Sequence, residues 1–350
     1  MTENPTTAVS RALVRLREDR SLPFSHDAAV AIRTLSVSTR PSSHVARIEV
    51  RSPTGTRRVI AKIPRGAQAK ADRRLQQLEA EFQATRFLAS IFKDEAELGV
   101  PEVVAFYSDV PALVCAEVGG ATLDRIAERS ARGIPCAARL AQLEIACRGA
   151  GRWIRALQAA TPVDGQQLAL DEMTDYIDIR LKRICELGPR GLGAEWRAKV
   201  QRVFAQARLA PSDLRLAAVH GDFSLSNIMY DGSRVVAIDF GRFGIGSIYH
   251  DVTRFYHQLG LLLHKPWFLP TTVARLRRAL LAGYDPRLRA DQPVFQLFLI
   301  QHLLCHWLGL LKTSAPCQVR GFHWWVGYRH RRELESLITQ FHQGARSGGV

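Results

Sequence analysis

The chain has 350 residues, of which 47% are hydrophobic, so it is long enough to bury the cores of two domains. Its formal net charge is +15, from 48 Lys and Arg against 33 Asp and Glu. Such a balance suits acidic partners, including nucleotides, phosphorylated substrates, nucleic acid and anionic membrane surfaces. The cations are spread along the chain without a block of five. The charge therefore indicates a solvated surface and no specific nucleic-acid site.

The six cysteines lie far apart, without a Cys-x-x-Cys pair or a histidine at finger spacing. This pattern favours reduced thiols in a cytoplasmic protein over a disulfide framework or a zinc site. The first twenty residues lack the apolar core of a signal peptide. The most apolar run, residues 294–311, contains Gln296, Gln301, His302 and His306, which are costly in lipid. We expect a buried helix there and no transmembrane segment.

The first third of the chain reads mostly as strands. Residues 45–50 alternate in polarity, a Pro-Thr-Gly-Thr turn follows, and residues 57–63 resume an extended pattern, so we expect an antiparallel hairpin. Apolar residues at helical spacing then predict a helix from about residue 71 to residue 92. Two short apolar strands follow, at residues 103–107 and 112–116.

Gly119 and Gly120 end this pattern, and beyond them the chain is largely helical. Strands before a glycine pair and helices after it indicate two architectures. The sequence therefore predicts an α+β fold, with a lobe of strands and one central helix over residues 1–117 and a larger helical lobe over residues 118–350.

The segment 217–244, AAVHGDFSLSNIMYDGSRVVAIDFGRFG, carries the chemistry. Its Asp-Gly pair predicts a two-residue hairpin turn, which places Asn227 and Asp239 at the open end of one hairpin. The second strand is apolar on both faces, so Asp239 needs a partner or a metal. Asn227 and Asp239 supply the protein oxygens that Mg²⁺ prefers. Asp222 can take a proton from a hydroxyl, and His220 is expected to be structural. This set is typical of phosphoryl transfer from a nucleotide.

Phosphoryl transfer also needs a fixed cation on the phosphates that are not transferred. Lys62 lies on a mostly apolar strand and points the same way as Ile60. Its expected partner is Glu81, which falls between Leu88 and Phe92 in the apolar stripe of the following helix. We therefore expect Lys62 and Glu81 to form an ion pair.

In this order of residues the chain resembles the protein-kinase-like fold and, within it, the aminoglycoside phosphotransferase family, which also holds choline and other small-molecule kinases. The resemblance rests on HGDFSLSN, VAIDFG, VIAK and Glu81, and it extends from about residue 30 to residue 285. It implies a kinase that uses ATP or GTP with Mg²⁺ and phosphorylates a hydroxyl of a small molecule such as a sugar, an amino alcohol or an aminoglycoside. The N-terminal lobe then binds the nucleotide, and the C-terminal lobe holds the catalytic loop and the acceptor.

The resemblance also implies a role for each site residue. Asp222 is the catalytic base, and Asn227 and Asp239 bind Mg²⁺. Lys62 binds the α and β phosphates, and Glu81 fixes Lys62.

The same resemblance implies where the adenine and the phosphates bind. The sequence also departs from the protein-kinase pattern in two places. The segment 115–118, including Glu117 and Val118, is the hinge that binds the adenine through its backbone. The usual glycine-rich phosphate loop is missing, and Ser42 and Ser43 stand between the first two strands, where hydroxyls and backbone N–H groups can cover phosphates. No Lys or Arg follows Asp222 closely, which disfavours protein substrates.

The acceptor side leaves alternatives open. The acids Asp164, Asp171, Glu172, Asp175 and Asp178 either hold a cationic acceptor or complement the dipole of the helix that they begin. Asp251 is expected to cap its helix and to tie it to the catalytic loop. The aromatic and basic residues from 324 to 332 either face a lipid or carrier-linked substrate or pack into the core.

Two other functions compete with a kinase. A catalytically weak nucleotide-binding regulatory module, a pseudokinase, fits the missing glycines, although the intact set of site residues argues against it. A nucleic-acid-binding protein is suggested by charge alone, and no recognition motif supports it. The identity of the acceptor and the oligomeric state do not follow from the sequence.

Overall fold

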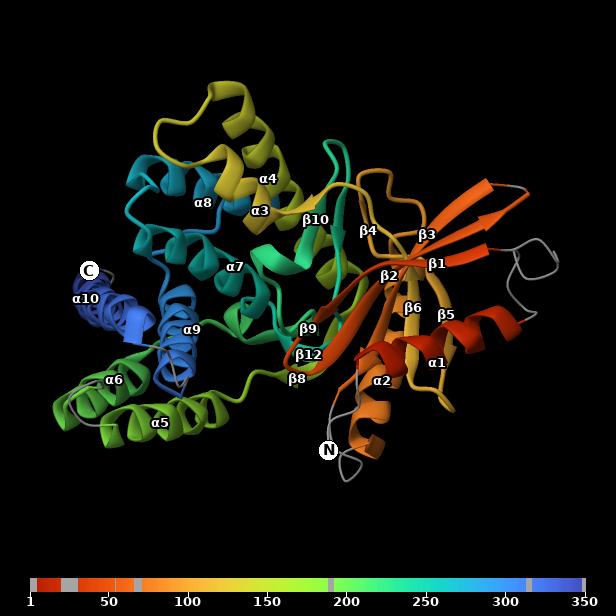
Figure 1. Ribbon diagram of the computed structural model, residues 1–350. Helices are drawn as coiled ribbons and strands as arrows, with labels where there is room; N and C mark the ends of the chain where they lie inside the picture. The colour runs from red at the N-terminus through yellow and green to blue at the C-terminus, as the bar shows by residue number, and fades with distance from the viewer. Residues whose placement is uncertain are drawn as a thin grey trace. The chain divides into compact units, whose positions relative to one another are not determined.

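The computed structural model describes residues 5–19, 31–53, 55–65, 71–187, 192–312 and 317–347. They pack as two compact units (Figure 1). The first is formed by Met1–Ala121 and Met229–Phe243, and the second by Thr122–Ile228 and Gly244–Val350. The architecture is mixed α+β, as expected, with most of the strands in the first unit and most of the helices in the second.

The first unit is built on a five-stranded antiparallel sheet in the order β1-β2-β3-β6-β5. Its hairpin of β2 and β3 is the one that the alternation predicts, with Ala46 opposite Ala61 and Val45 opposite Lys62. The elements of this sheet and its two helices are α1 (Pro5–Glu18), β1 (Ala31–Thr39), β2 (Ser43–Ser52), β3 (Gly55–Pro64), α2 (Ala71–Ile91), β5 (Val103–Tyr107) and β6 (Ala112–Ala116).

A helix packs on each face of this sheet. The sequence analysis did not predict α1, whose apolar face joins one core cluster with the buried residues of β2 and β3, including Ile48 and Ala61. Side chains on a strand alternate between faces. Lys62 therefore points away from α1 and reaches Glu81 on α2. The second helix covers the residues that the apolar spacing predicts.

A hairpin from the middle of the chain also belongs to the first unit. It is formed by β10 (Ile228–Tyr230) and β11 (Val235–Ala237), and β11 pairs in parallel with β4 (Leu98–Gly99). A division at 117/118 leaves this hairpin in the C-terminal lobe, whereas it lies in the first unit, in a second sheet with the order β4-β11-β10-β7. Gly120, at φ 85°, packs so closely that an added Cβ would lie 2.2 Å from the Tyr230 carbonyl oxygen.

The turn of this hairpin is longer than the expected two-residue turn. The amide of Asp231 donates to the carbonyl oxygen of Arg234. The Asp231 side chain accepts hydrogen bonds from the amides of Ser233 and Arg234, at 2.9 and 2.8 Å. An Asp side chain that bonds the following amides builds its own turn, and here it extends the loop over residues 231–234.

The second unit is mainly helical, with a small sheet in the order β12-β9-β8. A short strand, β7 (Ala121–Thr122), precedes its helices. Its elements are α3 (Leu123–Ser130), α4 (Ala137–Ala160), β8 (Pro162–Gln167), α5 (Leu170–Glu186), α6 (Ala194–Gln206), η3 (Pro211–Leu214), β9 (Arg215–Val219), η4 (Leu225–Asn227), β12 (Gly244–Ser247), α7 (His250–Leu261), η5 (Leu262–His264), α8 (Pro270–Tyr284), α9 (Pro293–Lys312) and α10 (Cys317–Ser347).

The helix α9 contains the apolar run of residues 294–311. By length and composition it is the one helix among the described residues that could cross a membrane, and 67% of its most apolar window is buried. It packs against α5, α7 and α10. Its apolar side chains therefore form part of the core of the second unit, and Gln296 and His302 are buried with them, 1% and 4% exposed.

The helix α10 carries the aromatic and basic segment. Val326 and Leu334 are buried, whereas the side chain of Trp324 is 71% exposed and stacks on Tyr328. Trp325 donates a hydrogen bond from Nε1 to the carbonyl oxygen of His264. One side of this helix therefore packs into the core, which was one of the two expectations for the segment, whereas Trp324 lies outside the core.

Candidate functional site

Lys62 lies at the centre of a three-residue charge cluster in the first unit. Its Nζ is 2.8 and 2.7 Å from the two carboxylate oxygens of Glu81 on α2, so the expected ion pair is present. The same Nζ is 2.7 Å from Oδ1 of Asp239, which follows β11. A sheet strand, a helix and a hairpin end therefore meet at one ammonium group.

Burial decides how firmly this cluster is held. The side chain of Glu81 is 8% exposed, and that of Lys62 is 25% exposed. Burial alone lowers the pKa of Lys62, but the two carboxylates outweigh it and raise that pKa, so the ammonium stays charged. An ammonium held between two carboxylates is fixed in place, as a cation that binds phosphates must be.

Asp239 has an unusual backbone. Its φ of 70° makes it the one non-glycine residue with a positive φ among those that the structure describes. A conformation of this kind costs on the order of 1–3 kcal/mol and persists at sites where the fold enforces it. We expected Asp239 among apolar neighbours, and β11 and Phe240 are indeed buried, but the strained backbone turns the carboxylate outward, and it is 51% exposed. Its carboxylate can therefore bind a ligand from solvent.

In the second unit, the loop that carries Asp222 is held by a buried carboxylate. Asp251 is fully buried, and its two oxygens accept the amides of His220 and Gly221, at 2.6 and 3.1 Å. Asp251 thus ties its helix to the loop that carries Asp222, as expected. It does not cap the helix as predicted, because Tyr249 holds the N-cap position, where no side-chain cap bond is formed. Although burial raises the pKa of Asp251, the neighbouring His250 and His220 lower it.

His220 has the structural role that the sequence analysis favours. It is fully buried, and its Nδ1 accepts the amide of Asp222 at 3.3 Å. Its ring lies edge-on to Phe223 and Trp153. Gly221, at φ 75°, makes the sharp bend between His220 and Asp222.

Asp222 has a partner that the sequence analysis missed. Nη2 of Arg254, on α7, forms an ion pair with Oδ1 of Asp222. Arg254 lies one turn after Asp251 on the same helix, so α7 both anchors the loop and supplies a cation to its carboxylate. No local spacing indicates this pair, because it forms only when α7 packs beside the loop.

Asn227 closes the same loop, at the end of η4. Its Nδ2 donates to the carbonyl oxygen of Asp222 at 3.0 Å, and its backbone amide donates to the carbonyl oxygen of Ser224. The hydrogen bond made by Nδ2 fixes the orientation of the side-chain amide. Its Oδ1 lies 3.5 Å from the hydroxyl oxygen of Ser226 and is the side-chain oxygen that could bind a metal. An amide oxygen of this kind, like the carboxylate oxygens of Asp239 in the first unit, is a donor that Mg²⁺ accepts in proteins.

Glu117 and Val118 follow β6 in the first unit. They line a pocket of about 710 Å³ together with Arg47, Arg57 and Arg58. The carboxylate of Glu117 pairs with Nε of Arg47 at 2.6 Å, and its amide donates to the carbonyl oxygen of Arg58. The pocket is polar and carries three guanidinium groups.

Ser42 and Ser43 lie in the tight turn from β1 to β2. Ser42 is exposed, and its carbonyl oxygen accepts the amide of Arg65. Ser43 is 4% exposed and begins β2, where its carbonyl oxygen accepts the amide of Arg40. The hydroxyl of Ser42 is the more accessible of the two.

The acidic run near α5 divides into separate roles. Asp171 and Glu172 lie in the first turn of α5, where they complement the helix dipole. Asp178 binds Nε of Arg197 on α6 at 2.6 Å, and hydrogen bonding to that guanidinium lowers the pKa of its carboxyl despite the opposing effect of burial. Asp164 lines a second pocket, of about 860 Å³, with three arginines. These contacts favour the structural reading for Asp171, Glu172 and Asp178.

Comparisons with known proteins give the fold and the family. A family model described as "Phosphotransferase enzyme family" matches residues 44–298. Among solved structures, a putative aminoglycoside phosphotransferase from Ralstonia eutropha has a TM-score of 0.60 at 13% identity, over 98% of this chain and 99% of its own. A choline kinase from Cryptosporidium parvum has a TM-score of 0.57 at 10% identity, over 97% of each chain.

A third structure is described as the streptomycin–ATP–APH(2'')-IIa ternary complex. It has a TM-score of 0.55 at 13% identity, over 95% of this chain and 98% of its own. At such low identity these likenesses show the fold alone, which is the α+β protein-kinase-like fold of small-molecule kinases. No curated protein sequence matches the chain significantly.

Proposed function

The chain belongs to the phosphotransferase enzyme family, and we propose that it moves the terminal phosphate of ATP to a hydroxyl of a small molecule. It is a phosphotransferase with an alcohol group as acceptor. The streptomycin complex described above contains ATP as well, and it supports ATP as the donor. We assign to residues of this chain each role that such a transfer requires.

The observation that carries the proposal is the position of Lys62. Its ammonium is bound by both oxygens of Glu81 and by Asp239, at 2.7–2.8 Å. Three surface charges that meet by chance rarely include a carboxylate as buried as Glu81, which is 6% exposed. We assign Lys62 to the α and β phosphates and Glu81 to holding Lys62 in place.

Asp222 is the proposed base. The acceptor oxygen attacks the terminal phosphorus, the bond from that phosphorus to the leaving ADP oxygen breaks, and the acceptor proton passes to the Asp222 carboxylate. Arg254 holds one oxygen of Asp222, while Asp251 fixes the amides on either side of the bend before it. These contacts position the carboxylate for an acceptor hydroxyl.

Asn227 and Asp239 are the proposed Mg²⁺ ligands. Mg²⁺, when bound, neutralises the charge that develops on the phosphates. Asn227 Oδ1 is oriented by the bond from its Nδ2 to Asp222, and Asp239 presents a half-exposed carboxylate from a strained backbone. The hinge residues Glu117 and Val118 are assigned to the adenine, and Ser42 and Ser43 to the phosphates.

The experiment that tests this proposal is a screen of ADP release across small-molecule alcohols with Mg·ATP. We expect at least one alcohol to raise the rate above that without acceptor. Asp222→Asn lowers that rate by about 10²- to 10⁴-fold. Asp94→Asn, at an exposed aspartate, serves as the matched control and leaves it unchanged.

Two results would overturn the assignment. Equal rates for Asp222→Asn and Asp94→Asn would remove Asp222 as the base. Tight binding of ATP without turnover on any acceptor would favour the regulatory-module alternative.

A further inference from the structure

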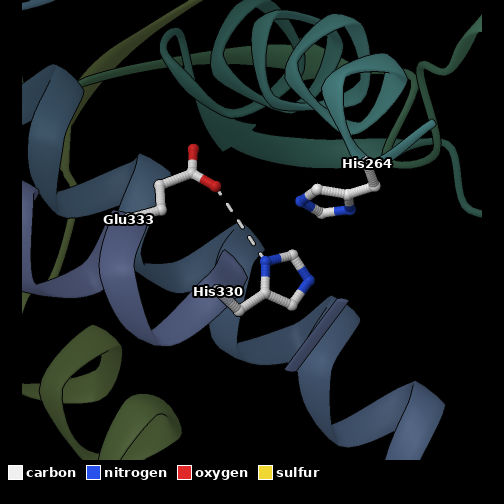
Figure 2. Close-up of side chains that lie close together, drawn as sticks. All are labelled: His264, His330 and Glu333. Carbon is white, nitrogen blue, oxygen red and sulfur yellow. Dashed lines mark ion pairs between the residues drawn. The ribbon is translucent and has the colours of Figure 1, made fainter. Parts of the chain in front are cut away.

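Figure 2 shows three ligand-type side chains that converge in the second unit, none of which is assigned to phosphate transfer. His264 ends η5, and His330 and Glu333 lie one turn apart on α10. Their candidate ligand atoms all lie within 4.8 Å of one another. His330 and Glu333 lie beyond residue 298, where the family model ends.

One atom of this group stands in an unusual environment. His330 is fully buried, and its Nδ1 has no hydrogen-bond partner among the described residues. The nearest acceptor, Oε2 of Glu333, lies 3.9 Å away, which is too far for a hydrogen bond. Buried ring nitrogens normally have a partner. A gap of this size between a nitrogen and a carboxylate oxygen can be filled by a metal bonded to both at about 2.0–2.2 Å, after a small adjustment.

The neighbours of His330 place it as a metal ligand requires. Its Nε2 is 2.8 Å from Nδ1 of His306 on α9. Metal-binding histidines characteristically hold the second ring nitrogen in a hydrogen bond, which fixes the ring and its tautomer. Through this contact Nδ1 of a neutral His306 can accept the proton on Nε2 of His330. The lone pair of His330 is then on Nδ1, on the side of Glu333.

The two other groups are also suited to this role. His264 is 5% exposed, and its ring lies 4.9 Å from that of His330, centroid to centroid. The carbonyl oxygen of His264 is fixed by the indole N–H of Trp325, at 3.0 Å. Glu333 is about one third exposed, which leaves a path from solvent to the cluster.

We propose that His264, His330 and Glu333 form a binding site for a divalent transition metal, with zinc as the preferred ion. Two imidazoles and one carboxylate are a common ligand set for zinc, and a water molecule can complete four-coordination. The metal connects η5 to α10 and so stabilises the C-terminal helix against the rest of the second unit. Cysteine counting did not favour a zinc site, because it does not register histidines that come together from distant segments.

The site is tested with full-length protein carrying a tag without histidine and stripped of metal by a chelator. Titration with zinc chloride is followed by calorimetry, and titration with cobalt chloride by visible absorption, which reports four-coordinate Co²⁺. We expect one ion per chain, an increase in the melting temperature with zinc, and loss of the cobalt absorption in Glu333→Gln. That variant binds zinc at least about tenfold more weakly than the parent.

Matched controls separate this site from others. Glu335→Gln changes an exposed glutamate on the same helix, and Asp239→Asn removes the proposed Mg²⁺ ligand; both keep parental zinc affinity. If Glu333→Gln does not fold, His264→Gln, on a different element, takes its place with the same expected loss. Equal zinc binding by Glu333→Gln and Glu335→Gln, or no saturable binding by the parent, would overturn the proposal. None of these measurements depends on phosphate transfer.

Discussion

Replacing Lys62 by methionine removes the shared partner of two carboxylates. The carboxylate of Glu81, on a residue that is 6% exposed, is then buried near Asp239 without its cation. Breaking a buried ion pair costs about 3–5 kcal/mol. Because the side chain of Lys62 is 25% exposed, we reduce this to roughly 2–4 kcal/mol for Lys62→Met. Glu81→Gln leaves Lys62 bound to Asp239 and costs less, roughly 1–2 kcal/mol.

The double variant Lys62→Met/Glu81→Gln gives the sharper result. It removes the buried charge together with its partner, so we expect it to be no less stable than Lys62→Met alone. If the two effects added instead, the double variant would lose roughly 3–6 kcal/mol, the sum of the ranges above. Strict additivity would refute the view that Glu81 is a buried charge held by Lys62.

The assay must report on the first unit. All six tryptophans lie in the second unit, so tryptophan fluorescence does not follow this change directly. Hydrogen exchange measured by mass spectrometry on peptides from β3 and α2 gives the free energy of local opening. Lys93→Met, at an exposed lysine just after α2, is the matched control and stays within about 0.5 kcal/mol of the parent.

Three further outcomes follow from the second unit. Asp251→Asn weakens two charge-assisted hydrogen bonds to loop amides. We expect its free energy of unfolding in urea, measured by tryptophan fluorescence, to fall by about 1.5–3 kcal/mol, whereas Asp94→Asn loses almost none. Arg254→Met frees the Asp222 carboxylate, and turnover falls by about 10²-fold with little change in stability; unchanged turnover would show that the pair does not position Asp222. Burial holds the pKa of His302 well below 6.5, so below pH 6.5 only the unfolded chain takes up that proton, and stability declines as the pH falls. In His302→Gln the dependence of the unfolding free energy on pH between 6.5 and 5.5 is shallower by up to about 1.4 kcal/mol per pH unit, and an unchanged slope would contradict a neutral buried His302.

The parts of the site that could be predicted depend on local pattern. Strand alternation places Lys62 on the face opposite Ala61, and helical spacing places Glu81 within the apolar stripe of α2. Both residues lie within a few elements of each other, so periodicity is sufficient to pair them. The strands of the first sheet and the buried helix α9 follow from the same kind of signal.

Other features depend on contacts between distant segments. The apolar face of α1 is short, so the sequence pattern alone does not predict this helix. Only its packing on the sheet identifies the face as part of the core. Arg254 meets Asp222 because α7 packs beside the loop, which no spacing within the loop reveals. The turn after Tyr230 is lengthened because the Asp231 side chain bonds two amides, which competes with the two-residue turn that Asp-Gly predicts.

The histidine cluster illustrates the same limit. His264 and His330 are separated by two helices in the sequence, and a metal motif read from spacing cannot join them. Their approach is decided by how α10 packs on η5 and α9.

The central claim is that this chain transfers the terminal phosphate of ATP to an alcohol with Asp222 as base. The most direct measurement uses ATP whose terminal phosphate carries ¹⁸O, an acceptor found by the ADP-release screen, and mass spectrometry of the product. We predict that the parent protein converts the alcohol to a phosphate ester that retains the three labelled oxygens, in amounts equal to the ADP formed, and that Asp222→Asn forms almost none. Release of ADP with all of the label in inorganic phosphate, or a labelled ester formed equally well by Asp222→Asn, would contradict the account.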